Sequence, residues 1–284
     1  MENLDTSDEG STGPSESSEA LGSLGLKGPV FVVGNGRSGT SVTLSTVRKT
    51  LGWKYHGEGH FYPVLREMML ASDRYFRSSR IERLAANEGH FVHHVKSSRI
   101  KFQLAEIIRS TYDEVYGTTQ FVDKTPGPQA ILSLPFLVRA FPDMRIIHMK
   151  RRGIEVLRSS RKKFADTPFE DHIQIWKKAL ENWERVMPKL ACPHITIDQH
   201  ILSTQPEVVT AELSQFLQLS EAQSEAMLGY FTEDRPQSSG DLNRGGVSLA
   251  ASGWTDEEIA LFRAEAGELM RRHGWSEDEA YFAA

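Results

Sequence analysis

A glycine-rich loop between a predicted strand and a predicted helix constrains the fold of this chain more than any other feature. Residues 30–33 (VFVV) form a short apolar run of the kind found in buried parallel strands. Residues 34–41 (GNGRSGTS) follow, and apolar residues then recur at helical spacing, at Val42, Leu44, Val47 and Leu51. In this order the free backbone N–H groups and the helix dipole converge on one point. The segment therefore predicts a phosphate-binding cradle, against the simpler alternative of a glycine turn that only joins strand to helix.

The loop departs from the Walker pattern GxxxxGK(S/T) at the position of its lysine. Gly34 and Gly39 have the required spacing, and Ser41 takes the hydroxyl position. Thr40, however, stands where the lysine would contact a triphosphate, and the positive charge lies inside the loop at Arg37. We therefore expect the reacting group to lie beside the loop rather than at the end of a triphosphate chain.

A second cluster of basic residues predicts a second anion site. Residues 145–149 are expected to form a strand, and Lys150, Arg151 and Arg152 follow it directly. Ser159 lies about two helical turns beyond Arg151 in the next predicted helix. A cation at the carboxyl end of a strand and such a hydroxyl can meet one phosphate at the sheet edge, where open α/β sheets bind ligands. Taken alone the run could be a solvated basic face, but together with the glycine loop it implies a ligand with two separate phosphate groups.

The rest of the chain predicts an α/β protein. Short strand-like runs alternate with helical patterns, at 53–56, 120–123 and 194–198. Such alternation indicates βαβ units, so we expect a P-loop-like three-layer fold with a central parallel sheet flanked by helices. From about residue 206 the pattern is helical, and Thr255 with Glu258 marks the start of a last helix that runs to His273.

Charge and composition restrict the partners and the location. Residues 1–28 hold six acids and one base among many Ser and Gly residues, which predicts a disordered tail before a domain over 29–284. The tail carries the whole net charge of −5, so the domain has no excess of cations for nucleic acid. The chain has no apolar run of roughly 18 residues for a transmembrane helix. An acidic N-terminus without a signal peptide and a single cysteine, Cys192, favour the cytoplasm.

With these residues in view, the sequence resembles the sulfotransferases that use 3'-phosphoadenosine 5'-phosphosulfate (PAPS). Residues 33–41 resemble the family's 5'-phosphosulfate loop, in which a basic residue followed by Ser-Gly-Thr-Thr or Ser-Gly-Thr-Ser replaces the Walker lysine. Arg151 and Ser159 match the family's 3'-phosphate pair and its spacing. The resemblance covers about residues 29–275. It implies transfer of the sulfuryl group of PAPS to a hydroxyl or amine, with 3',5'-ADP as the other product and no metal required.

Within this family, the sequence is most similar to the tyrosylprotein type and its bacterial relatives. Residues 57–60 (GEGH) resemble the segment that carries their catalytic glutamate, so the resemblance implies that Glu58 is the base. That segment has two adjacent acids and a nearby arginine, where this chain has Gly59 and His60. The sequence Asp-Lys-Thr-Pro around Lys124 resembles their lysine segment beside the sulfonyl group.

The resemblance thus implies three catalytic residues, Glu58, Arg37 and Lys124. It also implies a set of donor-binding residues, namely Gly36, Arg37, Ser38, Gly39, Thr40, Ser41, Arg151 and Ser159. Arg244 or the glycines at 245–246 resemble a loop that closes on the nucleotide. His60 and His94 stay open as alternative bases, and no metal-ligand spacing joins them to Glu58.

Other functional classes remain open at this point. The acceptor is a small molecule or a peptide, and the oligomeric state cannot be read. The rival enzyme class is a P-loop nucleotide kinase or NTPase with a degenerate Walker loop, for which Asp123 is the one acid at a strand end that could bind Mg²⁺. A third possibility is a nucleotide-binding module without catalysis.

Overall fold

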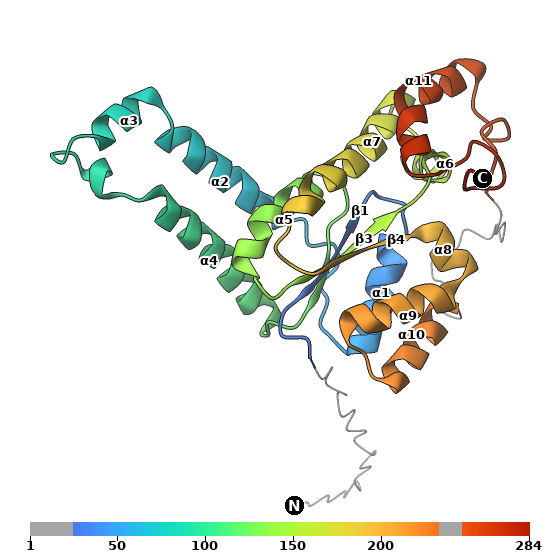
Figure 1. Ribbon diagram of the computed structural model, residues 1–284, viewed down its shortest axis with the longest axis horizontal. Coiled ribbons are helices and arrows are strands. Elements are labelled where there is room, and N and C mark those ends of the chain that lie inside the picture. Colours follow the sequence, from blue (N-terminus) through green and yellow to red (C-terminus); the bar gives the residue numbers. More distant parts are fainter. Residues whose placement is uncertain (1–24, 233–245) are drawn as a thin grey trace, which may run out of the picture.

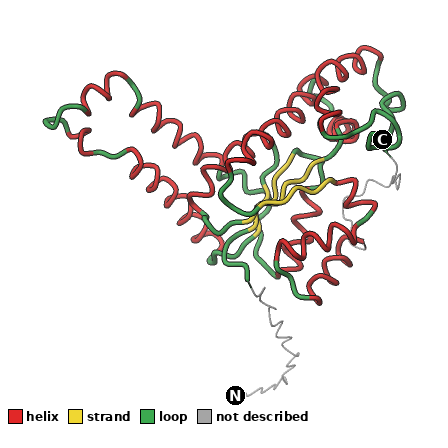
Figure 2. Tube along the Cα trace, in the orientation of Figure 1, coloured by secondary structure: helices red, strands yellow, loops and turns green. Residues whose placement is uncertain are grey.

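The computed structural model describes residues 25–232 and 246–284. Within them, four parallel strands form one sheet in the order β2-β1-β3-β4, which occupies the centre of the molecule (Figure 2). The strands are β1 (Val30–Gly34), β2 (Val122–Lys124), β3 (Arg145–Lys150) and β4 (His194–Asp198). The predicted α/β fold with a central parallel sheet is therefore confirmed.

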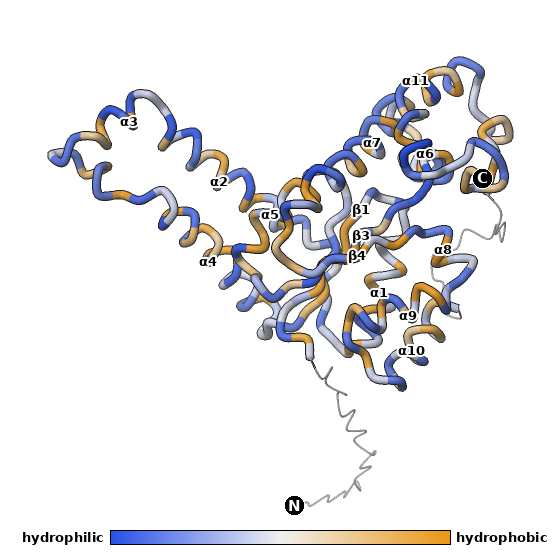
Figure 3. The backbone as a smooth tube through the Cα atoms, viewed as in Figure 1, coloured by the Kyte–Doolittle hydropathy of each residue, from blue (hydrophilic) through white to orange (hydrophobic). Residues whose placement is uncertain are grey.

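Helices cover both faces of the sheet, which explains why β1 is apolar throughout. Phe31 and Val33 point into one core, and Val30 and Val32 point into the other, because successive strand residues face opposite ways. The first core contains residues of α2 (Pro63–Phe76), α4 (Ser97–Tyr116), α5 (Pro128–Ala140) and α7 (Phe169–Val186). The second contains residues of α1 (Thr40–Leu51), α8 (Gln199–Thr204), α9 (Pro206–Leu217) and α10 (Glu221–Thr232). Hydrophobic and hydrophilic residues alternate along these helices, as expected when one side of each packs on the sheet (Figure 3).

A third apolar cluster joins α6 (Gly153–Lys163) and α7 to the C-terminal helix α11 (Asp256–Arg272). Thr255 caps α11 in a capping box with Glu258, as the sequence predicts. A short 3₁₀ turn, η2 (Met187–Lys189), follows α7. This cluster fixes α6, the helix that carries Ser159, against the carboxyl end of β3.

A helical arm projects away from the sheet (Figure 1). It is built from α2, α3 (Ser79–Ala85), the 3₁₀ helix η1 (Phe91–His94) and α4. Between residues 77 and 100 only Ile81 is buried, and the other side chains in the outer part of the arm are exposed or half-buried. His94 lies in η1, where its ring contacts the backbone carbonyl of Glu88, far along the arm from the sheet.

The predicted strand at 53–56 does not form. Lys54 and Glu58 instead make two isolated bridges, to Phe121 and Lys124, alongside the short edge strand β2. Gly57, with a φ of +89°, bends the chain between these bridges, and a strand cannot continue through such a bend.

The N-terminal boundary also differs from the expected one. Leu26 is 3% exposed and packs in the core beside α1, so the packed body includes residues before 29. Residues 1–24 of the expected tail, and Arg244 and Gly245 of the expected nucleotide loop, lie outside the described residues. Among the residues that are described, no helix is long and apolar enough to cross a membrane.

Candidate active site

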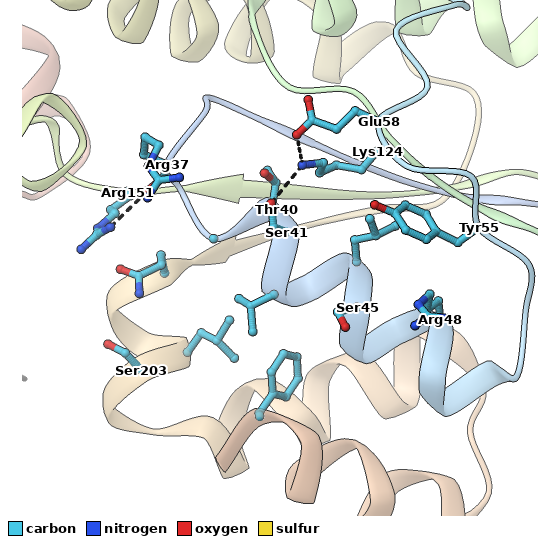
Figure 4. A pocket seen from close by; sticks show the side chains of 16 residues that line it. Arg37, Thr40, Ser41, Ser45, Arg48, Tyr55, Glu58, Lys124, Arg151 and Ser203 are labelled. Carbon is cyan, nitrogen blue, oxygen red and sulfur yellow. Dashed lines mark hydrogen bonds and ion pairs between the residues drawn. The ribbon is translucent and has the colours of Figure 1, made fainter. Parts of the chain in front are cut away.

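The carboxyl edge of the sheet gathers most of the residues that the sequence singles out, although Gly36, Ser38 and Ser159 do not line the cavity there. The glycine loop follows β1, Lys124 ends β2 and Arg151 follows β3. Because parallel strands end at the same edge, these segments meet around one cavity of about 480 Å³ (Figure 4). The cavity is lined by Arg37, Gly39, Thr40, Ser41, Val42, Leu44, Ser45, Arg48, Tyr55, Glu58, Lys124, Arg151, Gln199, Leu202, Ser203 and Phe231.

The glycine loop has the backbone of an anion site. Gly39, at the N-cap of α1, has a φ of +88°, and no described side chain caps the helix there. Arg37 also has a positive φ, of 69°, which a non-glycine residue adopts only at some cost in energy. The buried hydroxyl of Ser38 has no hydrogen-bond partner among the described residues. The first N–H groups of α1 are thus left for a ligand, and the loop conformation is one that a bound anion would stabilise.

Arg37, Arg151 and Ser159 are linked to one another. Arg37 Nε donates a hydrogen bond to Ser159 Oγ at 2.9 Å, and Arg151 Nη1 donates to the carbonyl of Arg37 at 3.1 Å. Burial lowers the pKa of Arg151, although Glu155 and Tyr281 oppose that effect. The buried Nε of Arg151 has no partner in the described part of the chain. A nearly buried guanidinium with a free donor is a site that favours an anion.

Lys124 joins the glycine loop to Glu58. Its Nζ donates to Ser41 Oγ at 2.9 Å and forms an ion pair with Oε1 of Glu58 (Figure 4). The Lys124 side chain is 4% exposed, whereas that of Glu58 is 42% exposed and faces the cavity. Burial alone would raise the pKa of Glu58, but hydrogen bonds from Lys124 and His60 outweigh it and hold the pKa below its ordinary value.

A buried acid lies beneath this ion pair. Asp123 is 1% exposed, and burial raises its pKa to about 6 despite hydrogen bonds from the hydroxyls of Thr125 and Tyr112. A Cβ at Gly59 would overlap Oδ2 of Asp123. A side chain at position 59 would therefore require Asp123 to move, and glycine avoids this overlap.

The structure separates the candidate bases and buries Asp123. Glu58 and His60 are in contact beside Lys124, whereas His94 lies in the arm. Asp123 is not among the residues that line the cavity. The described residues hold no cluster of three or more His, Cys, Asp or Glu side chains that could bind a metal.

Several lining residues were not identified from the sequence. Ser45 and Arg48 lie one and two turns beyond Ser41 on α1, so the helical period could have found them. Leu202 and Phe231 reach the cavity from α8 and α10. Nothing in their local sequence indicates this, because their approach depends on how the helices pack. Gly36 lies in the loop with open space around its Cα, and no atom of it lines the cavity.

Comparison with known proteins finds similar structures and one matching family model. Two solved structures are similar to this chain at low identity. The sulfotransferase domain of the olefin synthase of Synechococcus PCC 7002 is 20% identical, with a TM-score of 0.48 over 76% of this chain and 81% of that chain. Sulfotransferase STF9 of Mycobacterium avium is 14% identical, with a TM-score of 0.47 over 91% of this chain and 79% of that chain. No curated protein matches the sequence. The model of the sulfotransferase family matches residues 29–223, which is most of the chain, and the protein therefore belongs to the sulfotransferase family.

Proposed function

We propose that this sulfotransferase uses PAPS as its donor and transfers the sulfuryl group to a hydroxyl or amine of a small-molecule or peptide acceptor, releasing 3',5'-ADP. The observation that carries the proposal is the presence of two cationic sites on one cavity. One is the glycine loop with Arg37, and the other is Arg151 with its unpartnered Nε. We place this activity in a domain that extends to residue 284, with residues 1–24 as a tail.

The residues present fit a nucleotide with phosphates on both sides of its ribose. The uncapped start of α1 would hold the 5'-phosphate, and Arg151 with Ser159 would hold the 3'-phosphate. Leu44, Leu202 and Phe231 add an apolar part to the lining of the cavity, which would suit a purine. A triphosphate fits less well, because Thr40 replaces the lysine that would bind it.

PAPS would supply the sulfuryl group, whose sulfur–oxygen bond to the 5'-phosphate breaks as the acceptor atom bonds to sulfur. Glu58 would take the proton that the acceptor loses, on an oxygen that faces the cavity. Lys124 and Arg37 would neutralise the charge that remains on the phosphate oxygen. Both cations are held in place before the reaction, Lys124 by Ser41 and Arg37 by Ser159, so little reorganisation is needed.

Calorimetry with 3',5'-ADP, 5'-AMP, ADP and ATP, each with and without Mg²⁺, tests the donor. We expect 3',5'-ADP to bind at least tenfold more tightly than 5'-AMP, without any need for Mg²⁺. Arg151→Ala should remove this preference, whereas Arg158→Ala, an exposed cation on the same helix as Ser159, should keep it. Mg²⁺-dependent binding of ATP in preference to 3',5'-ADP would favour the NTPase alternative instead.

Turnover separates an enzyme from a binding module. Radiolabelled PAPS incubated with a panel of phenols, peptides, lipids and glycans should label at least one acceptor class. Glu58→Gln should abolish that labelling while it leaves the affinity for 3',5'-ADP unchanged, since the substitution keeps the shape and removes the basicity. Tight binding of 3',5'-ADP with no transfer to any acceptor would indicate a non-catalytic nucleotide-binding protein.

A further inference from the structure

We propose that His60 is a positioning residue for the catalytic base. Its ring holds one oxygen of Glu58 and so directs the other oxygen into the cavity. This inference rests on the proposed function, because it assigns a role within the same site. It goes beyond that function because it gives Glu58 a second partner, His60, whose protonation should change how the rate depends on pH.

The carboxylate of Glu58 is held at both oxygens by different elements. His60 Nε2 lies 2.7 Å from Oε2, and Lys124 from β2 contacts Oε1. A carboxylate only accepts hydrogen bonds, so Nε2 of His60 must carry a proton in this contact. Two partners on opposite oxygens fix the plane of the carboxylate. If Lys124 alone held Glu58, the group could rotate about its last bond.

The backbone conformation of His60 places its ring in contact with Glu58, two residues earlier in the chain. His60 has a φ of +47°, which is uncommon for a residue with a side chain. Its N–H donates to Thr125 Oγ1 at 3.0 Å, and Thr125 in turn donates to the buried Asp123 at 3.2 Å. Gly59, which has no room for a Cβ, allows the loop to lie this close to Asp123. Strained residues persist where the surroundings over-determine them, and such positions cluster at functional sites.

The position of His60 also links the base to solvent pH. The side chain of His60 is 58% exposed, so water reaches its ring, whereas the side chain of Lys124 is 4% exposed. The charged or titratable groups that face it are Glu58 from its own loop and Asp123 and Lys124 from β2. When His60 gains a second proton, the positive charge beside Glu58 stabilises the carboxylate and weakens it as a base. The rate therefore rises with pH as His60 returns to the neutral form.

Two variants of His60 isolate its role, with His94→Ala as a matched histidine control in the arm. His60→Gly suits the positive φ and so preserves the fold while it removes the ring. His60→Gln keeps an N–H donor that does not titrate. The expected result for His60→Gly is a loss of about tenfold in kcat with an unchanged KM for the donor, and partial recovery on addition of imidazole. His60→Gln should keep kcat within about threefold at high pH and lose the acid limb of its pH profile. A purely structural role would give neither recovery nor a changed pH profile.

A second measurement needs no turnover. Carbon NMR titration of the labelled Glu58 carboxyl should show a higher pKa in His60→Gly than in the wild type, because a hydrogen bond that stabilises the carboxylate is lost. His94→Ala should leave that pKa unchanged. An unchanged Glu58 pKa in His60→Gly, or a wild-type pH profile in His60→Gln, would overturn the inference. If no acceptor is ever labelled but the Glu58 pKa still shifts, the proposed function fails while the contact between His60 and Glu58 stands.

Discussion

Replacing Asp123 with asparagine should change how the stability of this protein depends on pH. Asp123 is the most deeply buried acid beside the site, at 1% exposure. Its hydrogen-bond donors are hydroxyls, and the nearby Lys124 and His60 lower its pKa less than burial raises it. Burial raises its pKa from 3.8 to about 6. Asparagine has nearly the same shape and stays neutral at every pH, so the comparison isolates the cost of the buried charge.

The size and sign of the effect follow from this pKa. A difference of about two units corresponds to about 3 kcal/mol, at about 1.4 kcal/mol for each unit. Because the pKa of Asp123 is higher in the folded state than in the unfolded state, its favourable contribution is fully present below about pH 4. That contribution is lost as the pH rises to about 6. Asp123→Asn should therefore gain stability relative to the wild type over this window, by up to about 3 kcal/mol at pH 8, less the cost of any altered hydrogen bond with Thr125 or Tyr112.

Urea unfolding followed by tryptophan fluorescence, at several values between pH 4 and pH 8, measures this difference. The exposed Asp166, in the loop between α6 and α7, supplies the matched control, and Asp166→Asn should show no such pH dependence. Burial depresses the pKa of His148, which makes the fold less stable below about pH 6.5, but this term is shared by both proteins and cancels in the comparison. A difference in unfolding free energy between Asp123→Asn and the wild type that stays constant with pH would refute the reasoning.

Three further outcomes are expected. Arg37→Ala should lower kcat by roughly 100-fold or more and change donor affinity far less, since the charge that Arg37 neutralises develops during the reaction. If steady-state kinetics showed a change in KM alone, Arg37 would be a ground-state contact instead. Gly59→Ala should destabilise the fold by about 1 to 3 kcal/mol in urea unfolding because its Cβ overlaps Asp123, whereas Gly36→Ala, with open space around it, should keep wild-type stability. Deletion of residues 1–24 should leave the melting temperature and the affinity for 3',5'-ADP unchanged, and a large drop in melting temperature would show that the tail packs on the body.

The part of the site that could be predicted from sequence is the part built from contiguous residues at a strand end. The run 30–33 and the glycine loop obey local rules, because a buried strand must be apolar and a tight loop before a helix needs glycine. The parallel sheet then brings Lys124 and Arg151 to the same edge without further information. The spacing of Arg151 and Ser159 was likewise readable, since Arg151 lies just before α6 and Ser159 lies within the same helix.

The contacts that were not predicted depend on packing between distant segments. Residues 53–56 look like a strand because Trp53 and Tyr55 alternate with polar residues, but they lie at the sheet edge, where Gly57 turns the chain after a single bridge. The hydrogen bond from Arg37 to Ser159 joins the glycine loop to α6, two segments far apart in sequence, and no local pattern reveals it. The burial of Asp123 likewise comes from the surrounding aromatic rings of α4 and the strands, so a strand-end acid that looked available for Mg²⁺ is enclosed.

Lys124 links the proposed base to the proposed donor-binding loop. One buried ammonium contacts both Glu58, which would act on the acceptor, and Ser41, which closes the donor loop. A phosphate bound at the loop competes with Glu58 for this ammonium, because both are anions within its reach. In the proposed reaction, a phosphate that shares the Lys124 ammonium would weaken its hold on Glu58, so the pKa of Glu58 would rise and Glu58 would become a stronger base. With its other oxygen still held by His60, Glu58 would be the stronger base when a donor is bound, and proton removal from the acceptor would then depend on the presence of the group to be transferred.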